Sequence, residues 1–258
     1  MTSTLGADAG LTQDAFLGGR LNIWQPANGY RAGVDPVFLA AAVPALPGQS
    51  VLELGCGVGV ASLCLQHRVG GLDLTGLELQ PDYADLARRN AAENRLSFRV
   101  ICGDLGAMPG ELRALTFDHV IANPPYFDRA TGTRAQDTGR ETAVGEGAPL
   151  ARWIDAGVRR LAPKGHLTLI QKAGRLRDIL SAVDGRLGDL RVLPLAPRDG
   201  RDAELVIVRA RKGARGGLRL LAPMILHDGD RHVRDGESYR DPIGAILRTG
   251  AEFRVDWR

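Results

Sequence analysis

The sequence predicts an α/β fold, a Rossmann-like, doubly wound and mostly parallel seven-stranded sheet with an antiparallel terminal hairpin. Strand and helix patterns alternate from residue 50 to about residue 210. Repeated strand–helix units of this kind form a parallel sheet through right-handed crossovers. The last two strand patterns follow each other without room for a helix, so we expect them to pair as an antiparallel hairpin.

Seven short apolar segments are the predicted strands, and they cover residues 50–54, 74–79, 97–102, 117–122, 166–171, 189–195 and 204–210. Helices are predicted between them at residues 60–67, 81–94, 150–161 and 176–187. Pro81 suits the first turn of a helix, because its φ is already helical and its missing N–H needs no partner there. Residues 163–165, Pro-Lys-Gly, are expected to turn the chain into the fifth strand.

The rest of the chain gives a division into three parts. Residues 1–49, with an Ala-rich helix candidate at 37–43, form an N-terminal extension that we expect to pack over the ligand site. Residues 50–212 form the core domain, and residues 213–258 form a C-terminal extension. The polar segment 128–148 is too long for a routine connection, so it is predicted to be functional or disordered.

Composition excludes several classes of protein. The chain has 258 residues, 44% of them hydrophobic, enough for a core that needs no metal or disulfide. No apolar run is long enough to cross a membrane, and no secretory signal is expected. Cys56, Cys64 and Cys102 form no CxxC pair and are predicted to be reduced, buried thiols of a cytoplasmic protein. The five histidines lack ligand spacing, so no metal site is predicted.

Charge is distributed unevenly along the chain. Residues 1–128 carry eight Arg and no Lys against 13 acidic residues, whereas residues 129–258 carry 25 basic residues against 17 acidic ones. A basic second half is typical of a protein that meets a polyanion. However, only three of the 33 basic residues are Lys, and a general preference for Arg explains the same counts. The charge pattern alone leaves both explanations open.

A glycine-rich turn follows the first predicted strand. It contains Glu53, Gly55, Gly57 and Gly59, and such glycines let a backbone turn sharply and approach a ligand closely. Val60 stands where a dinucleotide fingerprint needs its third glycine. An acid in the turn would repel a pyrophosphate but suits an ammonium or sulfonium group. The turn therefore favours S-adenosylmethionine over a dinucleotide, with a ligand-free turn as the alternative.

Two further acids follow the second and third predicted strands. Glu78 is placed to reach ribose hydroxyls, although it could instead favour the dipole of the next helix. Asp104 could accept a hydrogen bond from an adenine amino group while Leu105 covers the ring. Because open α/β sheets bind ligands at the carboxyl ends of their strands, the three acids are expected at one site.

The fourth predicted strand ends in Asn123, Pro124, Pro125 and Tyr126. Two prolines make a rigid, extended turn and remove two backbone donors. The Asn123 side-chain oxygen and the Pro124 carbonyl can then accept both hydrogens of a planar NH2 group, which localises its lone pair for attack on a methyl group. Tyr126 offers a face on which a base can stack. A purely structural turn with a surface Tyr is the alternative.

Together these motifs resemble those of the class I S-adenosylmethionine-dependent amino-methyltransferases, over roughly residues 30–210. The NPPY turn is specific to members that methylate adenine N6, guanine N2 or a protein glutamine. The sequence is most similar to the bacterial tRNA (adenine-N6) methyltransferases that modify the base beside the anticodon of a valine tRNA. This resemblance also rests on residues 30–35 (YRAGVD), 123–127 (NPPYF), 196–198 (APR) and 206–212 (VIVRARK).

The resemblance implies roles for individual residues. Asn123, Pro124 and Tyr126 would hold the target. The cofactor-binding set would be Tyr30, Arg31, Asp35, Glu53, Gly55, Cys56, Gly57, Glu78, Leu79, Asp104, Leu105 and Asn123, with the first three over its methionine end. The implied partner is tRNA, with no membrane and no metal. The basic residues expected to contact RNA are Arg134, Arg140, Arg198, Arg211 and Lys212.

Three alternatives remain. The first is a protein-glutamine N5-methyltransferase of the release-factor type, for whose helical substrate domain 49 preceding residues are too few. The second is an rRNA guanine-N2 methyltransferase. The third is a catalytically silent RNA-binding module, which would have no chemical need for Glu53 or the NPPY turn.

Overall fold

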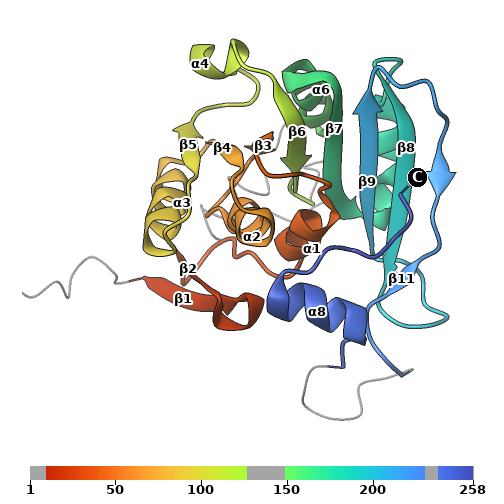
Figure 1. The fold of residues 1–258 in the computed structure, drawn as a ribbon, viewed down its shortest axis with the longest axis horizontal. Helices are drawn as coiled ribbons and strands as arrows, with labels where there is room; N and C mark the ends of the chain where they lie inside the picture. The colour runs from red at the N-terminus through yellow and green to blue at the C-terminus, as the bar shows by residue number, and fades with distance from the viewer. Residues whose placement is uncertain (1–9, 127–148, 230–237, 258) are drawn as a thin grey trace, which may run out of the picture.

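The computed structural model describes residues 10–126, 149–229 and 238–257. Its centre is one large sheet with the strand order β10-β8-β9-β7-β6-β3-β4-β5 (Figure 1). The seven long strands of this sheet are β3 (Ser50–Leu54), β4 (Asp73–Glu78), β5 (Arg99–Cys102), β6 (Phe117–Ala122), β7 (Leu161–Lys172), β8 (Leu187–Ala196) and β9 (Leu205–Lys212). All seven predicted strands are therefore present.

The pairing of these strands confirms the predicted topology. β5, β4, β3, β6 and β7 are parallel to one another, and β9 runs antiparallel between β7 and β8. Two short strands were not predicted, β10 (Arg219–Leu220) and β11 (Met224–Ile225), and both pair in parallel with the outer edge of β8. They satisfy backbone groups that an open sheet edge would leave unpaired.

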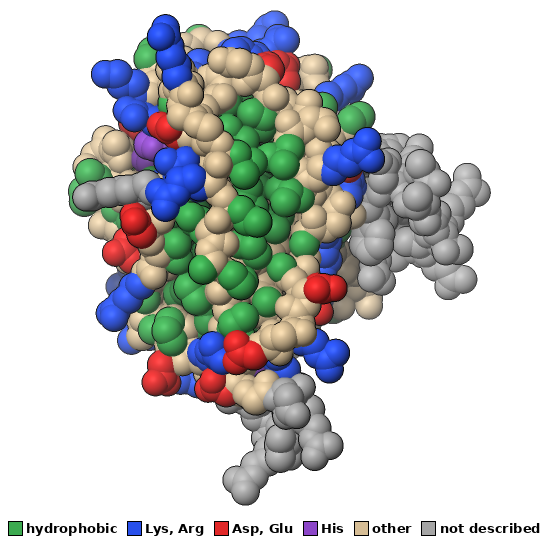
Figure 2. All heavy atoms as spheres, turned by 90° about the vertical axis from the view of Figure 1, so that its right-hand side faces the viewer, with side chains coloured by type: hydrophobic (Ala, Val, Ile, Leu, Met, Phe, Trp, Pro, Cys, Tyr) green, Lys and Arg blue, Asp and Glu red, His purple; other side chains and the backbone are tan. Residues whose placement is uncertain are grey.

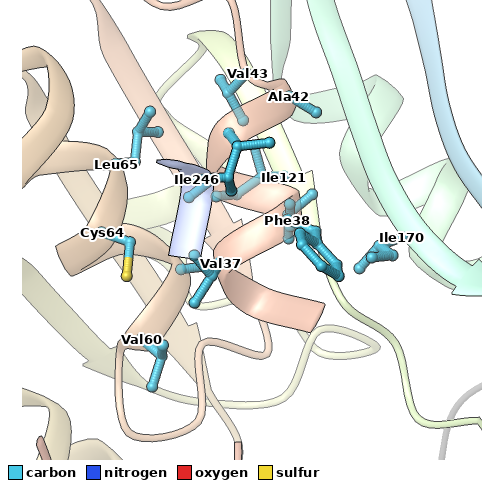
Figure 3. Close-up of a cluster of buried hydrophobic side chains, with 14 of the residues drawn as sticks. Val37, Phe38, Ala42, Val43, Val60, Cys64, Leu65, Ile121, Ile170 and Ile246 are labelled. Atoms are coloured by element: carbon cyan, nitrogen blue, oxygen red, sulfur yellow. The ribbon is translucent and has the colours of Figure 1, made fainter. Parts of the chain in front are cut away.

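Helices cover both faces of the sheet. α1 (Asp35–Ala42), α2 (Val60–Val69), α3 (Pro81–Glu93) and α8 (Asp241–Thr249) share one hydrophobic cluster with one face. α4 (Gly110–Arg113), α6 (Leu150–Arg160) and α7 (Leu176–Ala182) share a second cluster with the other face. Figure 3 shows Phe38 of α1 beside Ile170 of β7, in the same cluster as Ile121 of β6 and Ile246 of α8. Both faces are therefore buried, as a parallel sheet requires.

Two predicted boundaries differ from the structure. The helix expected at 176–187 ends at Ala182, because Val183 already has extended backbone and β8 begins at Leu187. The turn expected at 163–165 lies inside β7, which starts at Leu161. A register shift between Phe117 and His119 of β6 and a positive φ of 67° at Lys164 let the ladder continue past this point.

The N-terminal extension contains a hairpin that the sequence did not predict. β1 (Leu11–Phe16) pairs antiparallel with β2 (Leu21–Pro26). The hairpin is held to α3 by the fully buried Asn90, whose Oδ1 accepts from the backbone N–H of Trp24 at 2.8 Å. The amide of Asn90 also donates to the carbonyl oxygens of Trp24 at 3.1 Å and Val58 at 3.0 Å. One side chain thus fastens the hairpin to both α3 and the glycine-rich turn.

The C-terminal segment packs along the face of the sheet that carries α1. The backbone N–H of Phe253 donates to Ala41 at 3.0 Å, and residues after α8 run beside β8 and β9 (Figure 1). On the side of the molecule that presents β8, Figure 2 shows hydrophobic side chains gathered in the middle and Lys and Arg around them. In the described parts of the chain, no helix is long and apolar enough to cross a membrane.

Candidate active site

A cavity of about 750 Å³ opens at the carboxyl ends of β3, β4, β5 and β6. Its volume lies in the range typical of small-molecule sites. Of the residues predicted to form the site, every one except Asp35 lines this cavity: Tyr30, Arg31, Glu53, Gly55, Cys56, Gly57, Glu78, Leu79, Asp104, Leu105, Asn123, Pro124 and Tyr126. The structure therefore brings together residues that are up to 96 positions apart in the chain.

The glycine-rich turn is shaped for close approach of a ligand. Gly55 and Gly57 have positive φ values of 64° and 53°, which side chains other than glycine rarely adopt. A Cβ at Gly55 would lie 2.5 Å from the ring of Trp153, so this position is closed by packing. A Cβ at Gly57 would meet nothing within 4 Å. The backbone of Gly57 thus borders open space in the cavity.

Glu53 is the buried acid at the end of β3, with 3% of its surface exposed. The backbone N–H and the hydroxyl of Ser62 both donate to its Oε2, at 3.0 and 2.5 Å. Burial nevertheless raises the pKa of Glu53 to about 8, because the Ser62 bonds, which lower the pKa, do not offset the loss of water around the carboxylate. A cation in the cavity would favour the ionised form.

Each carboxylate oxygen of Glu78, at the end of β4, accepts a hydrogen bond from a backbone N–H. Its Oε2 accepts from Gly57 N at 2.8 Å and its Oε1 from Gln80 N at 2.9 Å. Burial raises the pKa of this carboxyl despite the two bonds. Each oxygen keeps a second lone pair, so the predicted contact with ribose hydroxyls is compatible with these bonds.

Asp104 and two leucines form the outer wall of the cavity. Asp104 is exposed, and its Oδ1 accepts from Gly106 N at 2.7 Å. Leu79 is 47% exposed, which is unusual for so apolar a side chain, and Leu105 is half-buried beyond β5. An acid with a free lone pair between two apolar side chains suits the edge and faces of an adenine ring.

The NPPY turn presents two acceptors of different quality. Asn123 Oδ1 is buried and has no hydrogen-bond partner among the described residues. The Pro124 carbonyl already accepts a bond of 3.2 Å from Nε2 of Gln171. Gln171 is fully buried at the end of β7, and its Oε1 accepts from Lys172 N at 2.8 Å. Because unpaired buried acceptors are costly, Asn123 Oδ1 is the group here that most needs a donor from a ligand.

Tyr126 is fixed by contacts that the sequence did not predict. Its hydroxyl donates to Asp35 at the start of α1, and the Lys172 ammonium lies 5.2 Å from its ring centroid. Burial, together with the charge of Asp35, raises the pKa of the Tyr126 hydroxyl, which stays neutral. Asp35 therefore acts on the site through Tyr126 rather than by lining the cavity.

Arg31, one of the residues predicted to bind the cofactor, is held by contacts with the N-terminal hairpin. Its guanidinium forms an ion pair of 2.5 Å with Asp14 and donates to the Pro26 carbonyl at 2.9 Å. The charged end of Arg31 is thus bound to the hairpin, although other atoms of the residue line the cavity. Tyr30 lies beside it, and its carbonyl accepts from the Tyr83 hydroxyl at 3.1 Å.

Two of the basic residues predicted to contact RNA also donate to backbone carbonyls. Arg198 is 8% exposed and donates to the carbonyl of Gly229 at 3.0 Å. Lys212 donates to the carbonyls of Val158 and Leu161 at 2.8 and 2.6 Å, which satisfies the end of α6. Bonds to backbone carbonyls do not neutralise these two charges, so a contact of either residue with RNA stays a prediction. Arg134 and Arg140 lie outside the described residues.

Some features were missed or misjudged from the sequence. Cys102 is exposed rather than buried, because it is the last residue of the edge strand β5. Arg152 and Trp153 of α6 line the cavity without having been predicted to do so. Gln171 carried a usable signal, since a lone amide at the end of an otherwise apolar strand must find partners when buried. No group of residues in the described ranges could hold a metal ion.

The residues present fit S-adenosylmethionine. Glu53 supplies a buried acid suited to a cationic ligand, and Asp104 with Leu79 and Leu105 suits an adenine. Gly57 leaves room beside the turn. The acceptor Asn123 Oδ1, which has no partner among the described residues, adds a position for an amine in the same cavity.

Comparisons with known proteins agree with this site. A family described as methyltransferase domain matches residues 51–136. The chain is 32% identical over 196 residues to a tRNA1(Val) (adenine(37)-N6)-methyltransferase of Porphyromonas gingivalis, which covers 70% of this chain and 76% of the relative. It is also 32% identical to a protein of the same name from Shewanella halifaxensis, over 62% of this chain and 66% of that relative.

Solved structures give the same fold. A predicted O-methyltransferase of Agrobacterium tumefaciens has a TM-score of 0.69 and 25% identity, over 85% of this chain and 98% of that one. A 16S rRNA N2 G1207 methyltransferase of T. thermophilus, solved with AdoMet and guanosine, has a TM-score of 0.54 and 17% identity. It covers 78% of this chain and 50% of that one, and shows similarity of fold.

Proposed function

The chain belongs to the class I S-adenosylmethionine-dependent methyltransferases, in the family of the bacterial tRNA1(Val) (adenine(37)-N6)-methyltransferases, and from this premise we propose that it methylates N6 of an adenine in tRNA. The target position that the relatives' name implies is adenine 37, next to the anticodon of a valine tRNA. S-Adenosylmethionine is the cofactor and supplies a methyl group on a sulfonium sulfur.

The observation that carries the proposal is the unpaired acceptor Asn123 Oδ1. In an adenine the N6 lone pair is delocalised into the ring, so the amine is a weak nucleophile. Asn123 Oδ1 and the Pro124 carbonyl would accept its two hydrogens and draw the nitrogen out of the ring plane. The lone pair would then be free to attack the methyl group that S-adenosylmethionine supplies, while Asn123 and Pro124 hold the two amine hydrogens until one of them passes to water. Positioning and electrostatics lower the barrier without a strong base.

Gln171 makes the second acceptor rigid. By donating to the Pro124 carbonyl at 3.2 Å, it fixes the direction of that oxygen and leaves it one lone pair for the amine. The weaker of the two bonds to the substrate is therefore expected at Pro124, and the stronger at Asn123. Tyr126 would stack on the target base with the ring face that Lys172 does not occupy, worth roughly 1–3 kcal/mol per base.

The acids would bind different parts of the cofactor. We assign Glu53 to the cationic methionine end, Glu78 to the ribose hydroxyls and Asp104 to the adenine amino group, with Leu79 and Leu105 on the ring. Residues 1–49 then serve as an extension that covers the site, because Tyr30 and Arg31 line the cavity. Residues 50–212 are the catalytic domain and residues 213–258 a C-terminal extension. A tRNA substrate places the reaction in the cytoplasm.

A matched pair of RNA substrates tests the proposal. An unmodified valine tRNA transcript and the same transcript with guanine at position 37 are incubated with the protein and labelled S-adenosylmethionine. Label is expected in the first RNA and not in the second. Equal labelling of both RNAs would contradict the position, and no labelling of either would contradict a tRNA substrate.

A further inference from the structure

A second groove, of about 450 Å³, lies away from the methyl-transfer cavity. Three arginines, one histidine and one tryptophan line it, and they come from β7, β8, β9 and the C-terminal segment. Its lining consists of Pro44, His166, Asp189, Arg191, Arg209, Ala210, Arg211, Val255, Asp256 and Trp257.

Strand register gathers the basic side chains on one face of the sheet. Arg211 of β9 lies opposite His166 of β7, and Arg209 lies opposite Arg191 of β8. Side chains two residues apart on a strand share a face, so Arg209 and Arg211 point to the same side. These positions lie toward the amino ends of the parallel strands, whereas the methyl-transfer cavity lies at their carboxyl ends.

Arg209 is the distinctive residue of this groove. Only 9% of its surface is exposed, yet its Nε has no hydrogen-bond partner in the described parts of the chain. Its guanidinium carbon lies 4.4 Å from the centroid of the Trp257 ring, which covers one face and leaves the N–H edges to find acceptors. Burial and the neighbouring Arg191 lower the pKa of Arg209 to about 10, so it is cationic at neutral pH. A buried cation with an unpaired donor is costly unless an anion joins it.

The charges of the other lining residues cancel one another, so the positive charge of Arg209 is not offset. Arg191 donates to the Trp257 carbonyl at 3.2 Å, and Arg211 makes a long bond of 3.4 Å to the Lys164 carbonyl. Neither of these bonds neutralises a charge. Burial, with the charges of Arg209 and Arg211, lowers the pKa of His166 to about 4, so its ring is neutral. Asp189 and Asp256 offset two of the three Arg charges and leave the groove with one in excess.

We propose that this groove binds a phosphate group, with Arg209 and Arg211 as its main donors and Trp257 holding Arg209 in place. Guanidinium N–H groups match the geometry of phosphate oxygens and form charge-assisted bonds with them. Two sources supply such a group, a small phosphate ester or the backbone of an RNA. The groove lies outside the methyl-transfer cavity, so the proposal does not depend on the methylated substrate.

Calorimetric titration with inorganic phosphate, with AMP and with an RNA oligonucleotide tests the proposal at constant ionic strength. The variants are Arg209→Gln and Arg211→Gln, and the matched control is Arg177→Gln, an exposed arginine of α7 on the other face. Loss of one charged hydrogen bond should weaken binding about ten- to a hundredfold. The control should bind like the wild type. Arg211 is half-exposed, so its variant keeps the test valid if replacement of the buried Arg209 impairs folding.

The pattern of losses identifies the source. Weaker binding of phosphate and AMP by the variants would support a small ester, and weaker binding of RNA alone would support a backbone phosphate. The proposal would be overturned if the wild-type protein bound none of the three ligands. It would also be overturned if Arg211→Gln and a folded Arg209→Gln bound them as tightly as the wild type. A wild-type protein that transfers no methyl group would count against the enzymatic function and not against this groove.

Discussion

Replacement of Asn123 should slow the methyl-transfer step and leave the binding of S-adenosylmethionine unchanged. Asn123→Ala removes a carboxamide oxygen that accepts no hydrogen bond from residues 10–126, 149–229 or 238–257, so no bond from those residues to this atom is lost. Glu78 accepts from Gly57 of the glycine-rich turn and Glu53 accepts from Ser62, and none of those bonds involves Asn123. Folding and affinity for S-adenosylmethionine should therefore stay close to wild type.

The rate of methyl transfer should fall steeply. The Pro124 carbonyl remains, but it already accepts from Gln171 at 3.2 Å, so it replaces little of what Asn123 provides. Removing one preorganised polar group of this kind lowers kcat by about 100- to 1,000-fold, or about 2.7–4 kcal/mol. The loss belongs in kcat, because the acceptor acts mainly as the lone pair localises.

Single-turnover methylation of saturating tRNA measures this loss, with calorimetry of S-adenosylmethionine binding on the same preparation. Asn123→Asp, which keeps an acceptor oxygen at the same position, should retain more activity than Asn123→Ala. A wild-type rate for Asn123→Ala would refute the mechanism and make the NPPY turn a structural feature. A loss of cofactor affinity as large as the loss of rate would show that Asn123 acts in cofactor binding and not mainly in methyl transfer.

Four further predictions follow from the site. Burial raises the pKa of Glu53 from 4.5 to about 8. The stabilisation that Glu53 gives the folded state is therefore complete below pH 4.5 and is lost as the pH rises through 8. Urea denaturation from pH 5 to 9 should show this decline in the wild type, and an equal decline in Glu53→Gln would contradict the prediction. Gln171→Leu should lower kcat and leave KM nearly unchanged, because the Pro124 carbonyl loses the hydrogen bond that fixes its direction; a kcat equal to that of the wild type would show that this bond has no role. Tyr126→Phe loses the bond to Asp35 and should raise KM for tRNA only mildly, whereas Tyr126→Ala should raise it far more; equal effects would argue against stacking. Asp104→Ala should weaken S-adenosylmethionine binding by about 1–3 kcal/mol in calorimetry, and unchanged affinity would remove Asp104 from the cofactor site.

Local patterns were enough to predict the core of the fold. The parallel strands are buried on both faces, so they stand out in the sequence as short apolar runs between helices, and all seven were found. β10 and β11 have two residues each, too few for any periodicity. The hairpin of β1 and β2 was missed because Asn90, 64 positions beyond the end of β2, fastens it to α3.

The site was predictable wherever a motif follows a strand directly. Glu53, Glu78 and Asp104 follow three neighbouring strands, and the topology alone brings them to one edge of the sheet. The partners of these groups depend on tertiary contacts that no local pattern encodes. The bonds from Gln171 to Pro124 and from Tyr126 to Asp35 join distant segments. The carbonyl contacts of Arg198 and Lys212 were not predictable for the same reason, because only the folded chain shows which carbonyls accept from them.

The central claim is that the protein methylates an exocyclic adenine amine in RNA. The most direct measurement is mass-spectrometric nucleoside analysis of bulk tRNA that lacks the modification, after incubation with the protein and S-adenosylmethionine. The account predicts N6-methyladenosine as the product, and its absence with Asn123→Ala. N2-methylguanosine as the product, or methyl transfer to a release-factor glutamine and not to tRNA, would contradict it.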